Sequence, residues 1–190
     1  MKNDTVKRCG WPSNDPLYIK YHDEEWGVPV YDDDTLFEFL VLETFQAGLS
    51  WITILRKREN FRKAFDNFNY AKIAQYDASK FEELRQNEGI IRNRLKIKAT
   101  TTNAKAFIKI QEEFGSFSKF IWAYVDGKPI KNKFKDYREG PANTPLSDQI
   151  SKDLKKRGFK FVGTTIVYAF MQATGMVNDH EVSCFRYNEV

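Results

Sequence analysis

The sequence has few of the residues that usually mark disulfides, metal sites or membrane segments. Only two cysteines and two histidines occur among 190 residues, which excludes a disulfide-rich secreted scaffold. No apolar run approaches the ~18 residues that a membrane span needs, and residues 1–8 are not followed by the apolar stretch of a secretory signal. We therefore expect a cytoplasmic protein with reduced cysteines and no membrane partner.

A strong charge of either sign is also lacking. The 30 Lys and Arg against 26 Asp and Glu leave a net charge of +4, which favours polyanions only mildly and excludes a histone-like protein. Aromatic residues are abundant by contrast, since 16 Phe, nine Tyr and four Trp exceed what a minimal core needs. We expect residues 1–190 to form a single monomeric domain of two helical lobes, with some of these aromatics lining a pocket between them.

Helical spacing of apolar residues dominates from residue 33 onward, and clean strand alternation is hard to find. The first of these helices would be capped by Asp33 or Asp34, and a long amphipathic helix over 95–114 would end at Gly115. Further helices are expected in the segments 51–65, 69–74, 79–89, 116–127 and 145–173, the last interrupted by a hairpin. The polar stretch 128–145 is expected to be a loop. The pattern predicts an all-α fold.

The two cysteines and two histidines fall into two close pairs at opposite ends of the chain. A loop can bring Cys9 and His22 to one point, and His180 and Cys184 would share one face of a helical turn. Two thiolates and two imidazoles form a closed tetrahedral set that is typical of a structural Zn²⁺ ion. We predict one such ion that joins residues 9–22 to residues 180–184. The alternative is that these are ordinary buried cysteines and hydrogen-bonded histidines.

Residues 148–173 predict two helices joined by a tight hairpin. Gly158 lies where the first helix should stop, and Gly163 precedes Thr164, a candidate cap of the second helix. A helix N-terminus at such a hairpin presents free amides to an anion such as a DNA phosphate. Basic residues surround it, namely Lys152, Lys155, Lys156, Arg157 and Lys160. The hairpin therefore predicts binding to the DNA backbone without sequence readout, and the alternative is a simple turn with a solvated basic face.

An acidic residue falls on the apolar stripe of the helix that begins near residue 33. Glu43 follows Leu36 by seven residues and Leu40 by three, and a carboxylate buried alone there is costly. The candidate neighbours are polar or aromatic, namely Gln46, Trp51, Trp11, Tyr18, Tyr21 and Trp26. An aromatic box with one carboxylate suits a flat, cationic ligand that carries an exocyclic amine. Alternatively, Glu43 is half exposed or paired with an arginine, and the aromatics are core residues.

Long segments of the chain resemble the 3-methyladenine DNA glycosylase I family, which belongs to the helix-hairpin-helix glycosylases. They are RCGW (8–11), DPLYIKYHDEEWGVP (15–29), LETFQAGLSWITILRKRENFRKAF (42–65), LKKRGFKFVGTTIVYAFMQATGMVNDH (154–180) and the final Cys184. The resemblance covers 8–184, and the segment 128–143 diverges from it. It implies an all-α fold with a structural zinc held by the four residues already singled out.

The resemblance also implies roles for individual residues. Glu43 would be the catalytic, base-recognising acid. Tyr18, Tyr21 and Trp51 would surround the extruded base, with Trp11, Trp26 and Gln46 as neighbours. The DNA-backbone contacts would come from the hairpin and the start of its second helix, namely Lys160, Phe161, Gly163, Thr164 and Thr165. From its position beside His180, and not from the resemblance, we expect Asp179 to orient that ligand and to take no catalytic part.

The expected reaction is hydrolysis of the N-glycosidic bond of 3-methyladenine in alkylated double-stranded DNA, which releases 3-methyladenine. No lysine stands where a Schiff-base nucleophile could be argued from the sequence, so we expect no strand cleavage. Two alternatives come from other classes: a zinc-stabilised DNA-binding module without activity, and a metal-dependent hydrolase. A buried acid among aromatics argues against the first, and four protein ligands, which leave no position for water, argue against the second.

Overall fold

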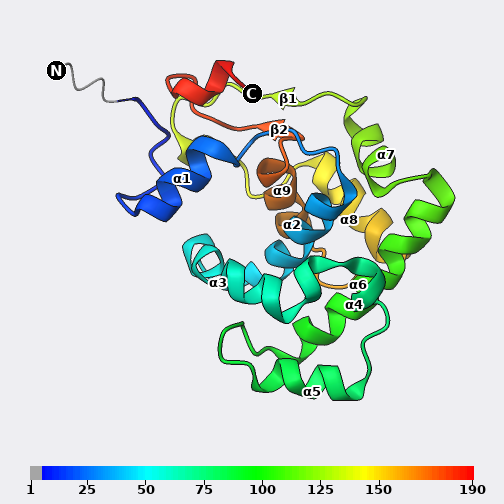
Figure 1. Cartoon of the computed structure of the whole chain (residues 1–190). Coiled ribbons are helices and arrows are strands. Elements are labelled where there is room, and N and C mark those ends of the chain that lie inside the picture. The colour runs from blue at the N-terminus through cyan, green and yellow to red at the C-terminus, as the bar shows by residue number, and fades with distance from the viewer. Residues whose placement is uncertain (1–5) are drawn as a thin grey trace.

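The computed structural model describes residues 6–190, and most of them lie in helices (Figure 1). The α-helices are α1 (Pro16–Glu24), α2 (Asp33–Gln46), α3 (Trp51–Ala64), α4 (Tyr70–Ile73), α5 (Ala78–Gln86), α6 (Arg94–Phe114), α7 (Phe117–Trp122), α8 (Pro145–Lys156) and α9 (Thr164–Ala173). Short 3₁₀ turns occur at Asp66–Phe68, Ala123–Val125, Tyr137–Glu139 and Phe185–Asn188. In the described part of the chain, no helix combines the length and apolar character needed to cross a bilayer.

The all-α prediction is correct for the bulk of the chain and wrong in one detail. Strands β1 (Ile130–Lys131) and β2 (Val177–Asn178) form a two-stranded parallel ladder, in which Ile130 lies opposite Val177. β1 belongs to the stretch that was expected to be only a loop. Two paired residues leave no periodicity that a sequence can display, so this contact depends on tertiary proximity. It fixes the stretch 128–145 to the C-terminal segment.

Helix α1 was not predicted, because its apolar residues do not form a continuous stripe. It starts at Pro16, and the side chain of Asp15 caps it by accepting the N–H of Leu17 at 2.9 Å. Its last two turns bury Tyr21 and His22. The helix therefore directs these neighbouring side chains into the protein interior.

The predicted cap of α2 is one residue off. Asp32 caps the helix by accepting the N–H of Thr35 at 2.8 Å. Asp33 instead accepts the first N–H groups of α7, from Phe117 at 2.9 Å and Ser118 at 2.8 Å. A carboxylate at the N-terminus of a neighbouring helix is electrostatically favourable. No local pattern distinguishes these two uses of adjacent aspartates.

Helix α2 lies at the centre of the molecule and is buried on nearly every side. Residues 39–45 are all buried along it, and it packs against α3, α6, α7 and α9. Figure 1 shows α2 and α9 in the middle, with the other helices around them. A helix that is enclosed in this way buries most of the side chains it carries. For this reason Glu43 lies in the interior.

The segment 145–173 folds as two helices joined by a short turn, as the glycine pattern predicted. Thr144 and Ser147 form the capping box of α8, and Gly158, with φ +95°, follows its end. Gly163 caps α9 through its backbone alone, so the expectation that Thr164 is the cap is wrong. The Thr164 hydroxyl instead lies 2.8 Å from the Ser147 hydroxyl and ties the two helix starts together.

Candidate functional site

One cavity of about 240 Å³ lies between α1, α2, α3 and α9. It is lined by all seven of the residues that the sequence suggested for a base pocket, which are Trp11, Tyr18, Tyr21, Trp26, Glu43, Gln46 and Trp51. These residues come from four segments that are separated by turns along the chain. The structure thus brings them together, whereas their individual roles remain proposals.

The aromatic rings pack edge to face and form a continuous wall. The Trp11 ring lies 4.9 Å from Tyr18 and 5.0 Å from Trp26, centroid to centroid, both in T-shaped geometry. Tyr21 lies 5.4 Å from Trp51, tilted by 48°. Such contacts hold each ring in one orientation and add to the stability gained by burial. The wall therefore offers rigid aromatic surface to a flat ligand.

Glu43 is the one carboxylate on α2 that is enclosed by apolar residues, and its side chain has no ion-pair partner among residues 6–190. The residue is 3 % exposed, and its Oε2 atom is buried without a hydrogen bond. Desolvation raises the pKa of Glu43 to about 8. The alternative that Glu43 is half exposed or paired with an arginine is therefore wrong for the described residues. An unsatisfied buried acceptor of this kind is costly and calls for a functional explanation.

The tyrosines beside Glu43 stay neutral. Burial, reinforced by the nearby Glu43 carboxylate, raises the pKa of Tyr21 well above its ordinary value, and the same two causes raise the pKa of Tyr18. The indole N–H groups of Trp11 and Trp51 are also buried without an acceptor. The cavity thus contains one potential anion, neutral aromatic faces and two unused donors.

Six further residues line the cavity that sequence reasoning did not assign to it, and they are Phe134, Tyr137, Gly140, Ala169, Gln172 and Asp179. The first three belong to the divergent stretch 128–143, whose two aromatics amid basic residues were the only signal. Ala169 and Gln172 are three apart on α9 and share a face. A glutamine in the otherwise apolar second half of α9 could have indicated this face.

Asp179 also lines the cavity, and the expected contact with His180 is absent from its hydrogen bonds. Its carboxylate accepts from Tyr168 at 2.7 Å, from Gln172 at 2.8 Å and from Asn132 at 2.6 Å. These three donors come from α9 and from the residue after β1. Asp179 therefore joins α9 to the residue after β1, and the prediction that it orients His180 is wrong.

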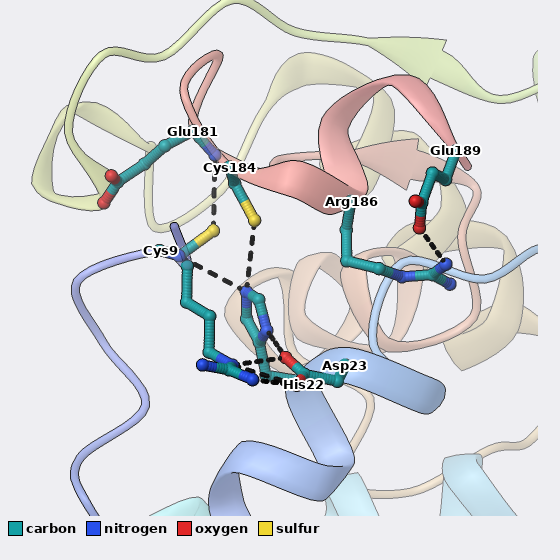
Figure 2. Close-up of polar contacts among 8 residues, drawn as sticks. Cys9, His22, Asp23, Glu181, Cys184, Arg186 and Glu189 are labelled. Atoms are coloured by element: carbon teal, nitrogen blue, oxygen red, sulfur yellow. Dashed lines mark hydrogen bonds and ion pairs between the residues drawn. The ribbon is translucent and has the colours of Figure 1, made fainter. Parts of the chain in front are cut away.

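Next to the cavity, three potential metal ligands cluster beneath the C-terminal segment (Figure 2). The ligand atoms of Cys9, His22 and Cys184 all lie within 4.8 Å of one another, and all three residues are buried. The Cys184 Sγ lies 3.5 Å from His22 Nε2, and the Cys9 Sγ accepts the N–H of Glu181 at 3.3 Å. His180 is outside this set, and residues 180–184 form a turn without a helix. The prediction of a helical His180–Cys184 pair is thus wrong.

Each histidine near this cluster is oriented by a partner on its other nitrogen. His22 Nδ1 lies 2.7 Å from an Asp23 oxygen, and that carboxylate also accepts hydrogen bonds from two nitrogen atoms of Arg8. The second ring is oriented by Asn178. Its Nδ2 donates to two backbone carbonyls, so its Oδ1 is the acceptor for His180 Nδ1–H at 3.1 Å. Both Nε2 atoms are consequently the ones that carry a lone pair.

His180 lies beside the cluster with this lone pair unused. Its Nε2 is buried without a hydrogen bond, and its ring centroid is 5.2 Å from that of His22. Burial, together with His22 and Arg186, lowers the pKa of His180 to about 3, so the ring is neutral. Neutral imidazoles and a pair of close thiols are what zinc requires. We refer to Cys9, His22, His180 and Cys184 together as the clasp.

The clasp and the cavity share walls. The Trp26 ring packs edge to face on His180 at 4.6 Å, and Trp11 packs on His22 at 5.3 Å. Glu181, buried next to His180, accepts the N–H groups of Gly10 at 2.8 Å and Tyr137 at 3.1 Å. The clasp and its neighbour Glu181 therefore contact three aromatic residues that line the cavity, namely Trp11, Trp26 and Tyr137.

The hairpin lies apart from the clasp and exposes part of its predicted DNA-binding set. Lys160, Phe161 and Thr165 are exposed, whereas Gly163 and Thr164 are partly covered. Phe161 has a positive φ of 55°, which turns its side chain outward at the hairpin tip. Arg157 is not free for a partner, because it pairs with Glu113 at 2.6 Å and stacks over Phe114.

A helical protein with a buried acid inside an aromatic cavity, a paired-helix hairpin and a Cys/His cluster has the features of a DNA glycosylase that captures a flat base. Comparisons with known proteins agree. A profile described as methyladenine glycosylase matches residues 11–187. The chain is 52 % identical over 182 residues to DNA-3-methyladenine glycosylase 1 of Escherichia coli strain K12, covering 96 % of this chain and 97 % of that one.

Solved structures give the same result. A crystal structure of 3-methyladenine DNA glycosylase I superposes with a TM-score of 0.92 at 53 % identity, covering 94 % of this chain and 98 % of that one. The enzyme from Staphylococcus aureus, described for its 3-methyladenine recognition, gives a TM-score of 0.91 at 39 % identity over 95 % and 96 % of the two chains. The chain belongs to the methyladenine glycosylase family, and the prediction of a DNA glycosylase is confirmed.

Proposed function

We propose that the protein hydrolyses the N-glycosidic bond of 3-methyladenine in alkylated double-stranded DNA, after the nucleotide is extruded into the cavity, and releases 3-methyladenine. The observation that supports this most strongly is Glu43, a buried carboxylate with an unpaired oxygen inside an aromatic wall. The names of the E. coli and S. aureus relatives point to the same base.

The chemistry of the lesion matches the cavity. N3-methylation places a positive charge on adenine and makes the base a good leaving group, so the enzyme need not protonate it. Aromatic faces attract a cation, and ionised Glu43 accepts a hydrogen bond from the exocyclic amine. Tyr21 and Trp51 enclose the base on two sides. Unmodified adenine lacks the positive charge, so it would not balance the negative charge of Glu43. This difference would favour 3-methyladenine over adenine.

We further propose that the clasp holds a structural zinc ion. Its donor set fits, since the two thiols and the His22 ring cluster within 4.8 Å and the buried Nε2 of His180 beside them has no hydrogen bond. A bound ion there would cross-link the two ends of the chain and would take no part in bond cleavage. Cys9 and Cys184 would bind as thiolates, while Asp23 and Asn178 keep the rings in register.

The DNA backbone is proposed to bind at the hairpin between α8 and α9. Gly163 precedes α9 as an N-cap without a side chain, so the first N–H groups of the helix are available to a phosphate. Lys152, Lys155, Lys156 and Lys160 are exposed around this point. Such contacts supply affinity that depends on salt and not on sequence. Gly163, Thr164 and Thr165 would make the contacts at the start of α9.

The reaction is proposed to stop at base release. A lyase that cleaves the strand through a Schiff base needs an amine next to the extruded nucleotide. No lysine is among the described residues that line the cavity. Water would therefore complete the hydrolysis at the sugar.

The test is incubation of the protein with methylated duplex DNA, followed by chromatography of the released bases. We expect free 3-methyladenine, little release by Glu43→Ala, and no covalent product with borohydride. Binding of methylated DNA without base release would favour a non-enzymatic DNA-binding module. A borohydride-trapped adduct would contradict the monofunctional mechanism, and undiminished release by Glu43→Ala would remove Glu43 from it.

A further inference from the structure

Helix α6 buries two polar side chains whose partners lie on two different functional segments. Lys96 is 6 % exposed and Asn103 is 1 % exposed. They are seven residues apart, which is two helical turns, so they share one face about 10 Å apart along the axis. Apolar residues of the same helix, including Ile97 and Phe107, are fully embedded in the core. α6 is therefore a fixed support for both side chains.

Lys96 holds the edge of the cavity. Its Nζ donates to the backbone carbonyls of Phe45 at 2.9 Å and Ala47 at 2.7 Å, on either side of the cavity-lining Gln46. Within residues 6–190, no carboxylate forms an ion pair with it. The ammonium instead compensates the negative end of α2, where carbonyls have no partner within the helix. A buried lysine used in this way costs desolvation, which lowers the pKa of Lys96.

The backbone that Lys96 holds continues into an exposed rim. Residues 47–50, which we term the rim segment, are all exposed, and they connect α2 to the first residue of α3, Trp51. Gly48 in this segment has φ +83°, and a Cβ atom at this position would meet nothing within 4 Å. The hydrogen bond from Leu49 N–H to the Gln46 carbonyl joins residues only three apart, so it does not attach the rim segment to another part of the protein. Lys96 is thus the side chain that anchors the approach to the rim segment to the body of the protein.

Asn103 holds the hairpin in the same manner. Its side-chain amide donates to the carbonyl of Lys160 at 3.0 Å and accepts the N–H of Lys160 at 2.7 Å. This pair of bonds satisfies the backbone at the hairpin tip from one side, next to the exposed Phe161. A bidentate contact fixes orientation as well as position. The hairpin tip cannot shift along α6 without breaking both bonds.

We propose that α6 is a spacer that sets the distance between the DNA-gripping hairpin and the rim of the base pocket, with Asn103 and Lys96 as positioning residues. The proposal rests on the proposed function, because it assigns the hairpin to the DNA backbone and the cavity to the extruded base. A backbone held at the hairpin presents the damaged nucleotide to the pocket only when this distance is kept. Misplacement by about 1 Å can cost about 100-fold in rate.

The experiment compares Lys96→Met and Asn103→Ala with the wild type on methylated duplex DNA and on free 3-methyladenine. For Lys96→Met we expect a fall of about tenfold or more in kcat, with KM for DNA within about twofold. For Asn103→Ala we expect KM to rise about tenfold. Both variants should bind free 3-methyladenine, measured by tryptophan fluorescence, within about twofold of wild type. Lys109→Met, an exposed lysine on the same helix, is the charge-matched control.

Hydrogen exchange supplies a readout that does not depend on activity. Lys96→Met should speed exchange in residues 46–50 alone, and Asn103→Ala should speed it in residues 159–163 alone. Should Lys96→Met not fold, Lys96→Arg takes its place, because the bulkier guanidinium cannot put one nitrogen between two carbonyls. We then expect a smaller fall in kcat, again with KM for DNA nearly unchanged, and a smaller rise in exchange in residues 46–50. Weakened binding of free 3-methyladenine in parallel with kcat, or kinetics equal to Lys109→Met, would overturn the spacer. A wild type that releases no base would instead refute the proposed function.

Discussion

The clasp and the base pocket are adjacent and share aromatic walls, yet they treat buried polar groups in opposite ways. In the clasp, Asp23 fixes the Nδ1 atom of His22 and Asn178 fixes the Nδ1 atom of His180. In the pocket, Glu43 has no such support and keeps a buried oxygen unpaired. The comparison teaches that the first arrangement suits the permanent occupant proposed above, whereas the second suits the proposed transient, cationic one.

The largest effect is expected from breaking the clasp with Cys184→Ala. Loss of one ligand should lower the zinc content, measured by elemental analysis, and lower Tm by about 10 °C or more. The reason is that structural zinc sites contribute several kcal/mol to folding, and each kcal/mol corresponds to about 2–4 °C for a chain of this size. Activity well below the new Tm should persist. A variant that keeps its Tm but loses turnover would assign the clasp to catalysis instead.

Removing the pocket acid should have the next largest effect. Glu43→Gln keeps the shape and loses the charge that the cationic base requires, so we expect kcat/KM on methylated duplex DNA to fall by about 10²–10³. The comparison is made by steady-state base release. Glu112→Gln, which neutralises an exposed glutamate on α6, is the matched control and should retain full activity. Equal losses in both variants would mean that overall charge, not the pocket, is responsible.

A smaller effect is expected from the residues that orient the clasp histidines. Asp23→Asn weakens the partner of His22 Nδ1 while leaving all four clasp residues in place. We expect zinc affinity, measured by competition with a chromophoric chelator, to fall by about 10–100-fold. Glu189→Gln alters an exposed ion pair in the C-terminal segment (Figure 2) and serves as the control. An unchanged affinity in Asp23→Asn would show that the rings are oriented by packing alone.

The smallest effect concerns the stability cost of leaving Glu43 unpaired. Its pKa of about 8 in the folded protein lies above the ordinary value of 4.5, so the folded state holds a proton that the unfolded chain releases. This contribution to stability is present at low pH and is lost as pH rises through about 8. Glu43→Gln does not ionise, so its Tm should exceed that of wild type by a margin that grows from pH 5 to 8 and then levels. A margin that does not change with pH would place the acid in a solvated site.

Much of the helical framework could be predicted because its signals are local. Gly115 and Ser116 separate α6 from α7 as expected, and Thr144 with Pro145 starts α8. Elements with weak local signals were missed, as α1 and the β1–β2 ladder show. The pocket residues could be proposed partly from the position of Glu43 on an apolar stripe and partly from family resemblance. The contribution of Phe134 and Tyr137 could not, since their stretch lacks periodicity and diverges from that family.

The sequence by itself determined which chemistry is available: one misplaced acid among tryptophans and tyrosines, two Cys/His pairs and two glycines at hairpin spacing. Residue type and spacing are sufficient for such conclusions, because side-chain chemistry does not depend on the fold. Only the tertiary structure decided which groups find partners. Glu43 has no hydrogen-bond partner for its buried oxygen. His180 is hydrogen-bonded to Asn178 and not to Asp179, and Lys96 donates to a backbone carbonyl of α2. Partnership depends on distances between segments far apart in the chain, and no local pattern encodes them.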